Sequence, residues 1–255
     1  PDTLIYHWDF DPAGITKVQG FGFVVDHTTW IADINYNFMA LTYNLGNFGT
    51  MGASFTISDV DEMSVTTVEE PDGTGEVFGV TDAVFSLAWA IDLTDNFSIG
   101  FNPKYIHQSI WRMSASAIAL DLGVKYVTPF DGAILAMSIT NFGPKMQLSG
   151  ATTQVLYDPD PNTSGNNSSI VANIQTDTWD LPLTFRVGVG YQPLKTEDNT
   201  ITVSLDALHL SDNYESLNVG AEYCYDDFIS LRAGYKSLFL PDSEESFSLG
   251  FGLKQ

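Results

Sequence analysis

Apolar and polar residues alternate with a period of two along most of the chain. The pattern is clearest between Leu181 and Tyr191, where every odd position is apolar and every even position is small or polar. Successive side chains of a β-strand point to opposite faces of its sheet, so this stretch predicts a strand between an apolar and a polar environment. A strand of about ten residues is long enough to cross a bilayer at a tilt.

The same alternation predicts about twelve strands, joined mostly by short links that suit antiparallel hairpins. In one of them, the apolar residues Ile34, Tyr36, Phe38 and Ala40 share a face. The strands are longer than the five or six residues that are usual in globular proteins, which disfavours a soluble sandwich or a β-rich repeat. The expected ranges are Val18–Asp26, Asp33–Tyr43, Phe48–Val60, Val80–Asp92, Phe97–Gln108, Ser114–Val127, Gly132–Asn141, Leu181–Tyr191, Thr200–His209, Glu215–Tyr225, Phe228–Lys236 and Ser246–Lys254.

Two long interruptions break the pattern, at Ser58–Glu76 and Phe142–Trp179. The first is rich in acidic residues, and the second contains the low-complexity stretch Asp158–Ser169. Segments of this kind are usually exposed, mobile loops. Residues 1–17 also lack the alternation and contain residues that break regular structure. We therefore expect an irregular N-terminal segment at 1–17, followed by strands over 18–255.

Charge is scarce in this chain and mostly acidic. Only 16% of the 255 residues are charged and the net charge is -22, whereas a soluble domain usually has about 25% charged residues. This balance argues against nucleic acid as a partner, because nucleic acid is bound by basic patches. No stretch reaches the roughly 18 apolar residues of a membrane-spanning helix. A membrane form must then be a closed barrel, and we predict an all-β fold, an antiparallel transmembrane β-barrel.

If the apolar faces contact lipid, the opposite faces line the lumen. Because isolated buried charges are unfavourable, Asp206 and Glu222 are expected to pair with arginines on neighbouring strands. Such a network can either fill the barrel or form a polar selectivity surface, and the pattern leaves both open. The charged residues of inward parity are Arg186, Asp206, Glu222, Arg232, Lys236 and Lys254.

Signals for catalysis and for metal binding are weak. The four histidines have no metal-ligand spacing. Asp158, Asp160 and Asn162 resemble the start of a calcium-binding loop. However, Thr163 stands where such a loop has glycine, and Ser169 stands where it has an acidic residue. A solvated acidic loop is the better interpretation, and we expect no enzyme activity, no cofactor and no metal site.

Several segments resemble one family of membrane barrels. Asp11-Pro-Ala-Gly follows Trp8 near the start of the chain. Later segments are Ser138-Ile-Thr-Asn-Phe-Gly-Pro-Lys-Met, Leu181-Pro-Leu-Thr-Phe-Arg-Val-Gly and Asn218-Val-Gly-Ala-Glu-Tyr. They are similar, in the same order, to segments of the PorV/PorQ family, which is related to the FadL long-chain fatty acid transporters. Asp11 stands where that family usually has asparagine.

The resemblance implies a barrel in the Gram-negative outer membrane. FadL-like barrels have fourteen strands, so two further strands are expected beyond Gln255. FadL relatives also place an N-terminal hatch in the lumen, and the residues that match it are Asp11, Pro12, Ala13 and Gly14.

Two functions follow from the resemblance. As a PorV-like protein, the chain would act in type IX protein secretion, binding or shuttling secreted proteins through its outer loops and contacting a secretion translocon. As a FadL-like channel, it would take up hydrophobic small molecules through an apolar pocket and a lateral opening. The inward faces are polar and rich in glycine, which favours the protein-binding role because a fatty-acid tunnel needs apolar walls. Outer-membrane lipid is an expected partner in either case.

Overall fold

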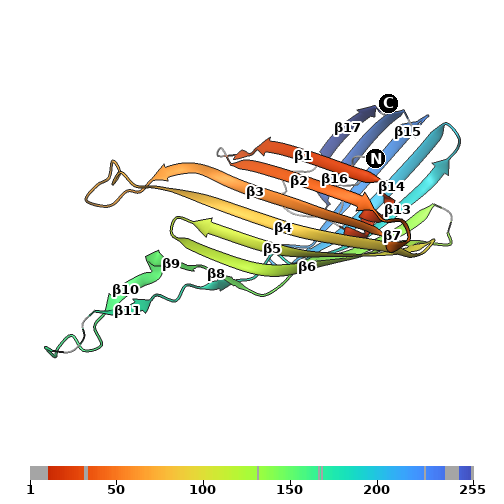
Figure 1. Cartoon of the computed structure of the whole chain (residues 1–255). Helices are drawn as coiled ribbons and strands as arrows, with labels where there is room; N and C mark the ends of the chain where they lie inside the picture. Colours follow the sequence, from red (N-terminus) through yellow and green to blue (C-terminus); the bar gives the residue numbers. More distant parts are fainter. Residues whose placement is uncertain are drawn as a thin grey trace.

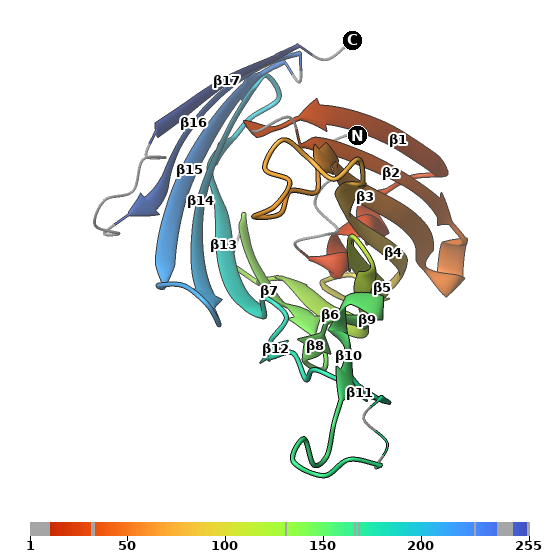
Figure 2. The same ribbon diagram turned by 90° about the vertical axis from the view of Figure 1, so that its left-hand side faces the viewer.

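In the computed structural model, most of the chain forms one antiparallel sheet that curls around a central space (Figures 1 and 2). The described residues are 11–31, 34–130, 132–165, 167, 169–226, 228–238 and 247–253. Each long strand pairs with the next long strand in the chain, which confirms the predicted all-β fold. The long strands are β1 (Phe21–Thr29), β2 (Asn35–Asn44), β3 (Thr50–Ser64), β4 (Val77–Thr94), β5 (Phe97–Ile110), β6 (Met113–Val127), β7 (Ala133–Phe142), β13 (Thr184–Lys195), β14 (Asn199–Leu210), β15 (Ser216–Tyr225), β16 (Ile229–Leu238) and β17 (Phe247–Leu253).

The alternating pattern predicted all twelve of these strands, and the differences lie at their ends. β3 continues to Ser64 and β4 already begins at Val77, so the loop between them is 65–76 and not Ser58–Glu76. This part of β3 carries acidic side chains because it extends beyond the apolar surface into water, where the apolar alternation is not needed.

The sheet has a seam between its two edge strands. Within the described ranges, β1 pairs only with β2 and β17 pairs only with β16 (Figure 2). Trp8 and Lys254, which the sequence singled out, lie outside the described residues.

The two ends of the barrel differ in the length of their links. We name them the turn end and the loop end. Short periplasmic turns and longer extracellular loops are typical of outer-membrane barrels. At the loop end, the links 65–76 and 143–183 are long. At the turn end, all links are short: 45–49, 95–96, 128–132, 196–198 and 226–228.

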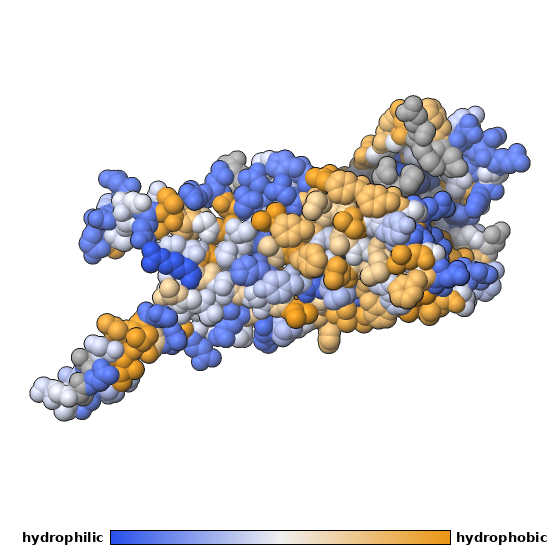
Figure 3. Space-filling view, in the orientation of Figure 1, coloured by the Kyte–Doolittle hydropathy of each residue, from blue (hydrophilic) through white to orange (hydrophobic). Residues whose placement is uncertain are grey.

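The outward side chains form an apolar band near the turn end. On β5, this face carries Phe97, Ile99, Phe101 and Tyr105, as the alternation predicts. Nine residues of a tilted strand span about 20 Å of barrel height, close to the roughly 25 Å apolar band of outer-membrane barrels. Toward the loop end, the surface over β3–β6 becomes hydrophilic (Figure 3). The strands β3–β6 therefore extend beyond the band into water.

Phe38 and Ala40 share a face of β2, as predicted, but the expectation that the apolar faces contact lipid is wrong for this strand. Phe38 and Ala40 are only 6% and 1% exposed, and they point into the lumen, where they pack with Ile15 and Val18. Both faces of β2 are apolar at this level because the lumen contains a packed segment, so alternation alone cannot distinguish lipid from core. The outward side chains are Met39, Leu41 and Tyr43.

The long loop between β7 and β13 contains short strands, which the sequence did not predict. Its β8 (Met146–Gln147) pairs with β12 (Thr178–Trp179), and β9 (Ser149–Gly150) pairs with β6. The hairpin of β10 (Gln154–Tyr157) and β11 (Ile170–Asn173) projects away from the barrel (Figure 1).

Three short 3₁₀ helices complete the described chain, and none of them is long and apolar enough to cross a membrane. They are η2 (Pro12–Lys17), η4 (Gly46–Phe48) and η5 (Ala151–Thr153).

Candidate functional site

The helix η2 fills part of the lumen near the turn end (Figure 2). Asp11 precedes it, and its carboxylate accepts a hydrogen bond of 2.9 Å from the backbone N–H of Ala13. Pro12 suits the first helical position, because a backbone N–H there has no partner within the helix and proline lacks this group. Ala13 and Ile15 are completely buried. The segment that resembles a hatch, which also includes Gly14, therefore lies inside the curved sheet against β4, β5 and β6.

Two glycines make room for η2. Gly100 on β5 and Gly123 on β6 lie directly opposite each other in the ladder. A Cβ atom on Gly100 would lie 2.3 Å from the backbone nitrogen of Ala13, and one on Gly123 would lie 2.0 Å from Oδ1 of Asp11. Real Cβ atoms do not approach other atoms so closely, so only glycine fits at these two positions. Sequence reasoning missed this pair, although both glycines have inward parity on neighbouring strands.

Charged groups hold both ends of η2. Burial raises the pKa of Asp11 to about 6, while the hydrogen bond from Ala13 and the positive charge of Lys125 favour its ionised form. At the other end of the helix, Lys17 and Asp92 on β4 form an ion pair with nitrogen and oxygen 3.7 Å apart. The docking of η2 is therefore sensitive to the protonation of Asp11.

The inner wall also carries two apolar clusters. The prediction of a polar, glycine-rich lumen is wrong for this part of the wall, because small alanines on the strands leave room for larger apolar side chains from η2, from β2 and from the long loop. The first cluster surrounds η2 and contains Ile15, Val18, Phe38, Ala40, Ala88 and Ala90. The second cluster lies on β6 nearer the loop end and contains Ala115, Ala117, Ala119, Met146 and Leu181, with Ile106, Leu148 and Trp179 packed against it.

Leu181 differs from its predicted position. Alternation assigned it to the outward face of a strand, but it is 6% exposed and packs in the second cluster. The reason is that β13 begins only at Thr184, so Leu181 belongs to the end of the long loop.

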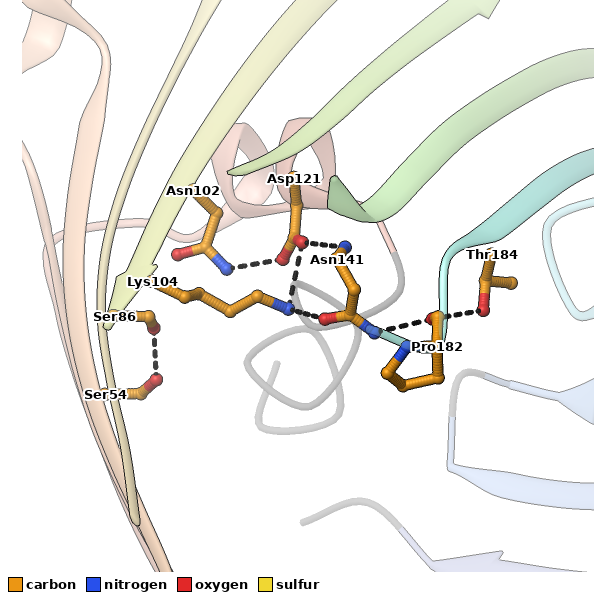
Figure 4. A network of polar contacts seen from close by, with 8 residues as sticks. All are labelled: Ser54, Ser86, Asn102, Lys104, Asp121, Asn141, Pro182 and Thr184. Carbon is orange, nitrogen blue, oxygen red and sulfur yellow. Dashed lines mark hydrogen bonds and ion pairs between the residues drawn. The ribbon is translucent and has the colours of Figure 1, made fainter. Parts of the chain in front are cut away.

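A buried polar network joins β5, β6 and β7 beside the second cluster (Figure 4). The fully buried carboxylate of Asp121 accepts hydrogen bonds from the side-chain amide of Asn102 at 2.9 Å and from the backbone N–H of Asn141 at 2.7 Å. Nζ of Lys104 lies 2.9 Å from Oδ1 of Asp121 and donates to Oδ1 of Asn141 at 2.6 Å. Nδ2 of Asn141 donates to the carbonyl oxygen of Pro182 at 3.0 Å. The network ties both ends of the long loop to the inner wall.

Other inward polar groups extend this surface across the sheet. Ser54 on β3 and Ser86 on β4 are buried, and their hydroxyl groups share a hydrogen bond of 2.5 Å (Figure 4). Oδ1 of Asn102 is buried and has no hydrogen-bond partner among the described residues. Such an unsatisfied acceptor is unfavourable by about 1–3 kcal/mol.

The pairing of β6 with β7 stops before the loop end. It ends where Leu120 pairs with Phe142. The next pair on this side of β6 joins Ser114 to Ser149 of β9. In the described part of the sheet, residues 115–119 of β6 therefore have no strand partner on this side. The long loop packs against this unpaired stretch of β6 through Met146 and Leu181.

The predicted lumenal charges lie on β13 to β16. Glu222 and Arg232 are opposite each other in the β15–β16 ladder and form an ion pair. Arg186 on β13 and Asp206 on β14 are close enough to attract each other electrostatically. Lys236 lies on β16 with the parity of Arg232. The structure thus pairs Glu222 with Arg232 and places Arg186 near Asp206.

The acidic loop that resembles a calcium site forms turns of its own. Oδ1 of Asp158 accepts a hydrogen bond of 3.0 Å from the backbone N–H of Asp160, and Oδ1 of Asp160 accepts one of 3.2 Å from that of Asn162. Across the described ranges, no group of three or more histidine, cysteine, aspartate or glutamate side chains is arranged to hold a metal ion.

The curved antiparallel sheet, its outward apolar band, its unequal ends and its lumenal helix define the fold of a FadL-like β-barrel. No protein-family model and no curated protein matches this chain. The crystal structure of the toluene transporter TodX from Pseudomonas putida is similar to it, with a TM-score of 0.52 and 13% identity over 96% of this chain and 83% of TodX. The monoaromatic hydrocarbon channel CymD gives a TM-score of 0.51 and 12% identity over 96% of this chain and 82% of CymD.

At this level of identity, the similarity shows the fold alone. TodX and CymD are outer-membrane channels of the FadL type, so the FadL-like part of the predicted resemblance is confirmed. Both are transport proteins and not enzymes.

Proposed function

We propose that this protein is a non-enzymatic channel of the Gram-negative outer membrane that passes hydrophobic small molecules. The observation that carries the proposal is the second apolar cluster, which lies on the lumenal side of β6 where this strand has no partner on one side. A hydrophobic molecule that enters from the loop end reaches this apolar cluster and the unpaired edge of β6.

The lumenal surface distinguishes this proposal from a water-filled pore. Porin channels have polar interiors, whereas Ala115, Ala117 and Ala119 present methyl groups to the lumen. Toward the turn end, the docked helix η2 occupies part of the lumen against β4, β5 and β6 and leaves less room for water and ions. Apolar walls with a few polar groups are typical of sites for hydrophobic ligands.

The similar solved structures support the same class of function. TodX is a transporter of toluene and CymD is a channel for monoaromatic hydrocarbons. They favour the channel over the role in type IX secretion that the PorV/PorQ resemblance implied.

Uptake by reconstituted protein tests the proposal. Proteoliposomes that contain the purified barrel are compared with protein-free liposomes for accumulation of radiolabelled toluene, palmitate and sucrose, with an enclosed acceptor for the hydrophobic compounds. The proposal predicts faster accumulation of at least one hydrophobic compound and no change for sucrose. Equal rates for the hydrophobic compounds in both preparations would refute it.

Binding of a protein partner by the loop end is a second candidate function, and the hairpin β10–β11 favours it. Leu156, Tyr157 and Val171 are 71%, 55% and 63% exposed on a hairpin that projects beyond the barrel (Figure 1). Exposed apolar groups outside the membrane often mark a protein interface. Crosslinking from a photoreactive residue at Leu156 in intact cells tests this function, and secreted proteins or a translocon subunit among the products would support it.

A further inference from the structure

The second apolar cluster has a floor made of small side chains. Ala115, Ala117 and Ala119 lie in a row on the lumenal face of β6, and Ile106 of β5 is opposite Ala117 in the ladder. Three neighbouring alanines leave a shallow recess in the wall. Lys104 lies nearby, but it is already paired with Asp121.

Two buried side chains of the long loop lie in this recess, and Leu148 and Trp179 of the same loop pack against the cluster. Met146 comes from the outgoing limb of the loop and is 1% exposed, and Leu181 comes from the returning limb and is 6% exposed. Gly143 allows the loop to approach the wall, because a Cβ atom there would lie 2.7 Å from the carbonyl oxygen of Ile118 and 2.9 Å from Cδ1 of Leu181. The loop therefore lies directly against the apolar floor.

The loop is attached to the wall mainly at its ends. At its base, Asn141 binds both Asp121 and Pro182. Farther out, β9 is joined to β6 through two residue pairs, and the backbone N–H of Ala151 donates to the carbonyl oxygen of Arg112 at 3.1 Å. The two limbs are bound to each other, because Gln147 donates to the carbonyl oxygen of Thr176 at 2.7 Å. Between these attachments, the described limbs contact the floor through apolar side chains.

We propose that Met146 and Leu181 occupy a binding site for the hydrophobic guest of the channel, and that the guest takes their place on the three alanines when the loop lifts. This inference rests on the proposed function and specifies its site. Lifting the loop uncovers the apolar floor and the unpaired part of β6, 115–119, at the same time. The loop is thus a self-inhibiting cover of the site.

The size and charge of the recess define the class of guest. The side chains of Met146 and Leu181 together have the bulk of a single aromatic ring with a short substituent. The nearest cation, Lys104, is neutralised by Asp121 and is not free to hold a carboxylate. The guest is therefore an uncharged hydrocarbon, and one of monoaromatic size fills the space of Met146 and Leu181.

A reversible disulfide tests whether the loop must lift. Ser114→Cys and Ser149→Cys are introduced together in a Cys224→Ser background, because residues paired across a ladder are close enough for a disulfide. Thr29→Cys with Asn35→Cys is the matched control, since it links two strands that stay paired. Oxidation is expected to lower toluene flux into proteoliposomes about tenfold in the first variant, and reduction is expected to restore it. Unchanged flux in the oxidised variant overturns the inference, provided that the background protein carries toluene.

Equilibrium binding separates a failure of the inference from a failure of the proposed function. Met146→Ala combined with Leu181→Ala empties the site, and saturation-transfer NMR is expected to show about tenfold tighter toluene binding. Adding Ala117→Leu refills the recess and is expected to remove this gain. If the emptied variant binds toluene no better than the parent, the inference is wrong even for a working channel. If the emptied variant binds toluene more tightly and Ala117→Leu removes this gain, but no variant transports toluene, the proposed binding site is supported and the proposed transport function is refuted.

Discussion

At the scale of single residues, Asp121 shows how the lumen accommodates charge. Its buried carboxylate receives hydrogen bonds from an amide and a backbone N–H, together with the ammonium group of Lys104. Removal of one partner from a buried pair leaves the other charge uncompensated, which is much less favourable than the loss of an exposed pair.

Asp121→Asn is therefore expected to lower the free energy of unfolding by about 3 kcal/mol, because Lys104 loses its counter-ion in a buried place. The matched control is Asp180→Asn, which breaks the exposed ion pair with Lys145 and is expected to change stability by less than about 1 kcal/mol. The midpoint of urea unfolding, followed by gel shift of the folded barrel, measures both. Equal effects of the two substitutions would contradict the structural role of Asp121.

Asp11 predicts a pH dependence of the docking of η2. Its pKa is raised to about 6 by burial, whereas an aspartate in water has a pKa near 3.8. The docked state binds a proton more readily than the displaced state, so docking strengthens as the pH falls through 6 toward 4 and weakens as it rises. The full change is about 3 kcal/mol at most.

Ion conductance through the barrel in a planar bilayer measures this effect. We expect more frequent openings at pH 7.5 than at pH 5, and a weaker pH dependence in Asp11→Asn, which can still accept the bond from Ala13. If the parent protein and Asp11→Asn show the same pH dependence, Asp11 is not its source, and Lys17, Lys125 or Asp92 is responsible instead.

Residue roles were less predictable from the sequence than residue positions. Alternation placed Glu222 and Arg232 on one face of neighbouring strands, and the ladder pairs them directly. It did not indicate the ion pair of Asp121 with Lys104. This pair depends on the register of β5 with β6, which the pattern leaves undefined.

At the scale of elements, the contact of η2 with the wall depends on two glycines, Gly100 and Gly123, which have no side chain to collide with the helix. Gly100→Ala is expected to displace η2, because the new methyl group would overlap the backbone of Pro12 and Ala13. Gly190→Ala is the matched control, since a Cβ atom there meets no other atom within 4 Å.

Conductance in planar bilayers is expected to rise severalfold for Gly100→Ala and to stay unchanged for Gly190→Ala, because η2 occupies part of the lumen when it is docked. Gly123→Ala should behave as Gly100→Ala does. A closed barrel in both variants would mean that η2 does not control the pore.

The strands were predictable because they face lipid on one side over many residues. The elements inside the barrel were not, since η2 and the loop strands β8 and β12 are held by contacts with the wall and have no period of their own. The same contacts explain why both faces of β2 are apolar.

At the scale of the whole molecule, the outward band defines how the barrel sits in a membrane. Leu205, near the middle of β14, is 43% exposed on the outward face. A charged side chain at the midplane of a membrane barrel is unfavourable by about 2–4 kcal/mol.

Leu205→Arg is thus expected to reduce the stability of the barrel folded in lipid vesicles by about 3 kcal/mol. Tyr214→Arg, in the link between β14 and β15 at the loop end, is the control and is expected to have an effect near zero. Folding titrations in urea measure both. Equal effects would mean that the apolar band does not lie in the bilayer.

The central claim is that a hydrophobic guest binds inside the barrel and not merely in the surrounding lipid. Photolabelling with benzophenone tests it most directly, because this small aromatic ketone inserts into nearby C–H bonds and the modified residues can be located by mass spectrometry. We predict labels on Met146 and Ile106 that excess toluene suppresses. Labels confined to outward residues such as Leu205, unaffected by toluene, would contradict the claim.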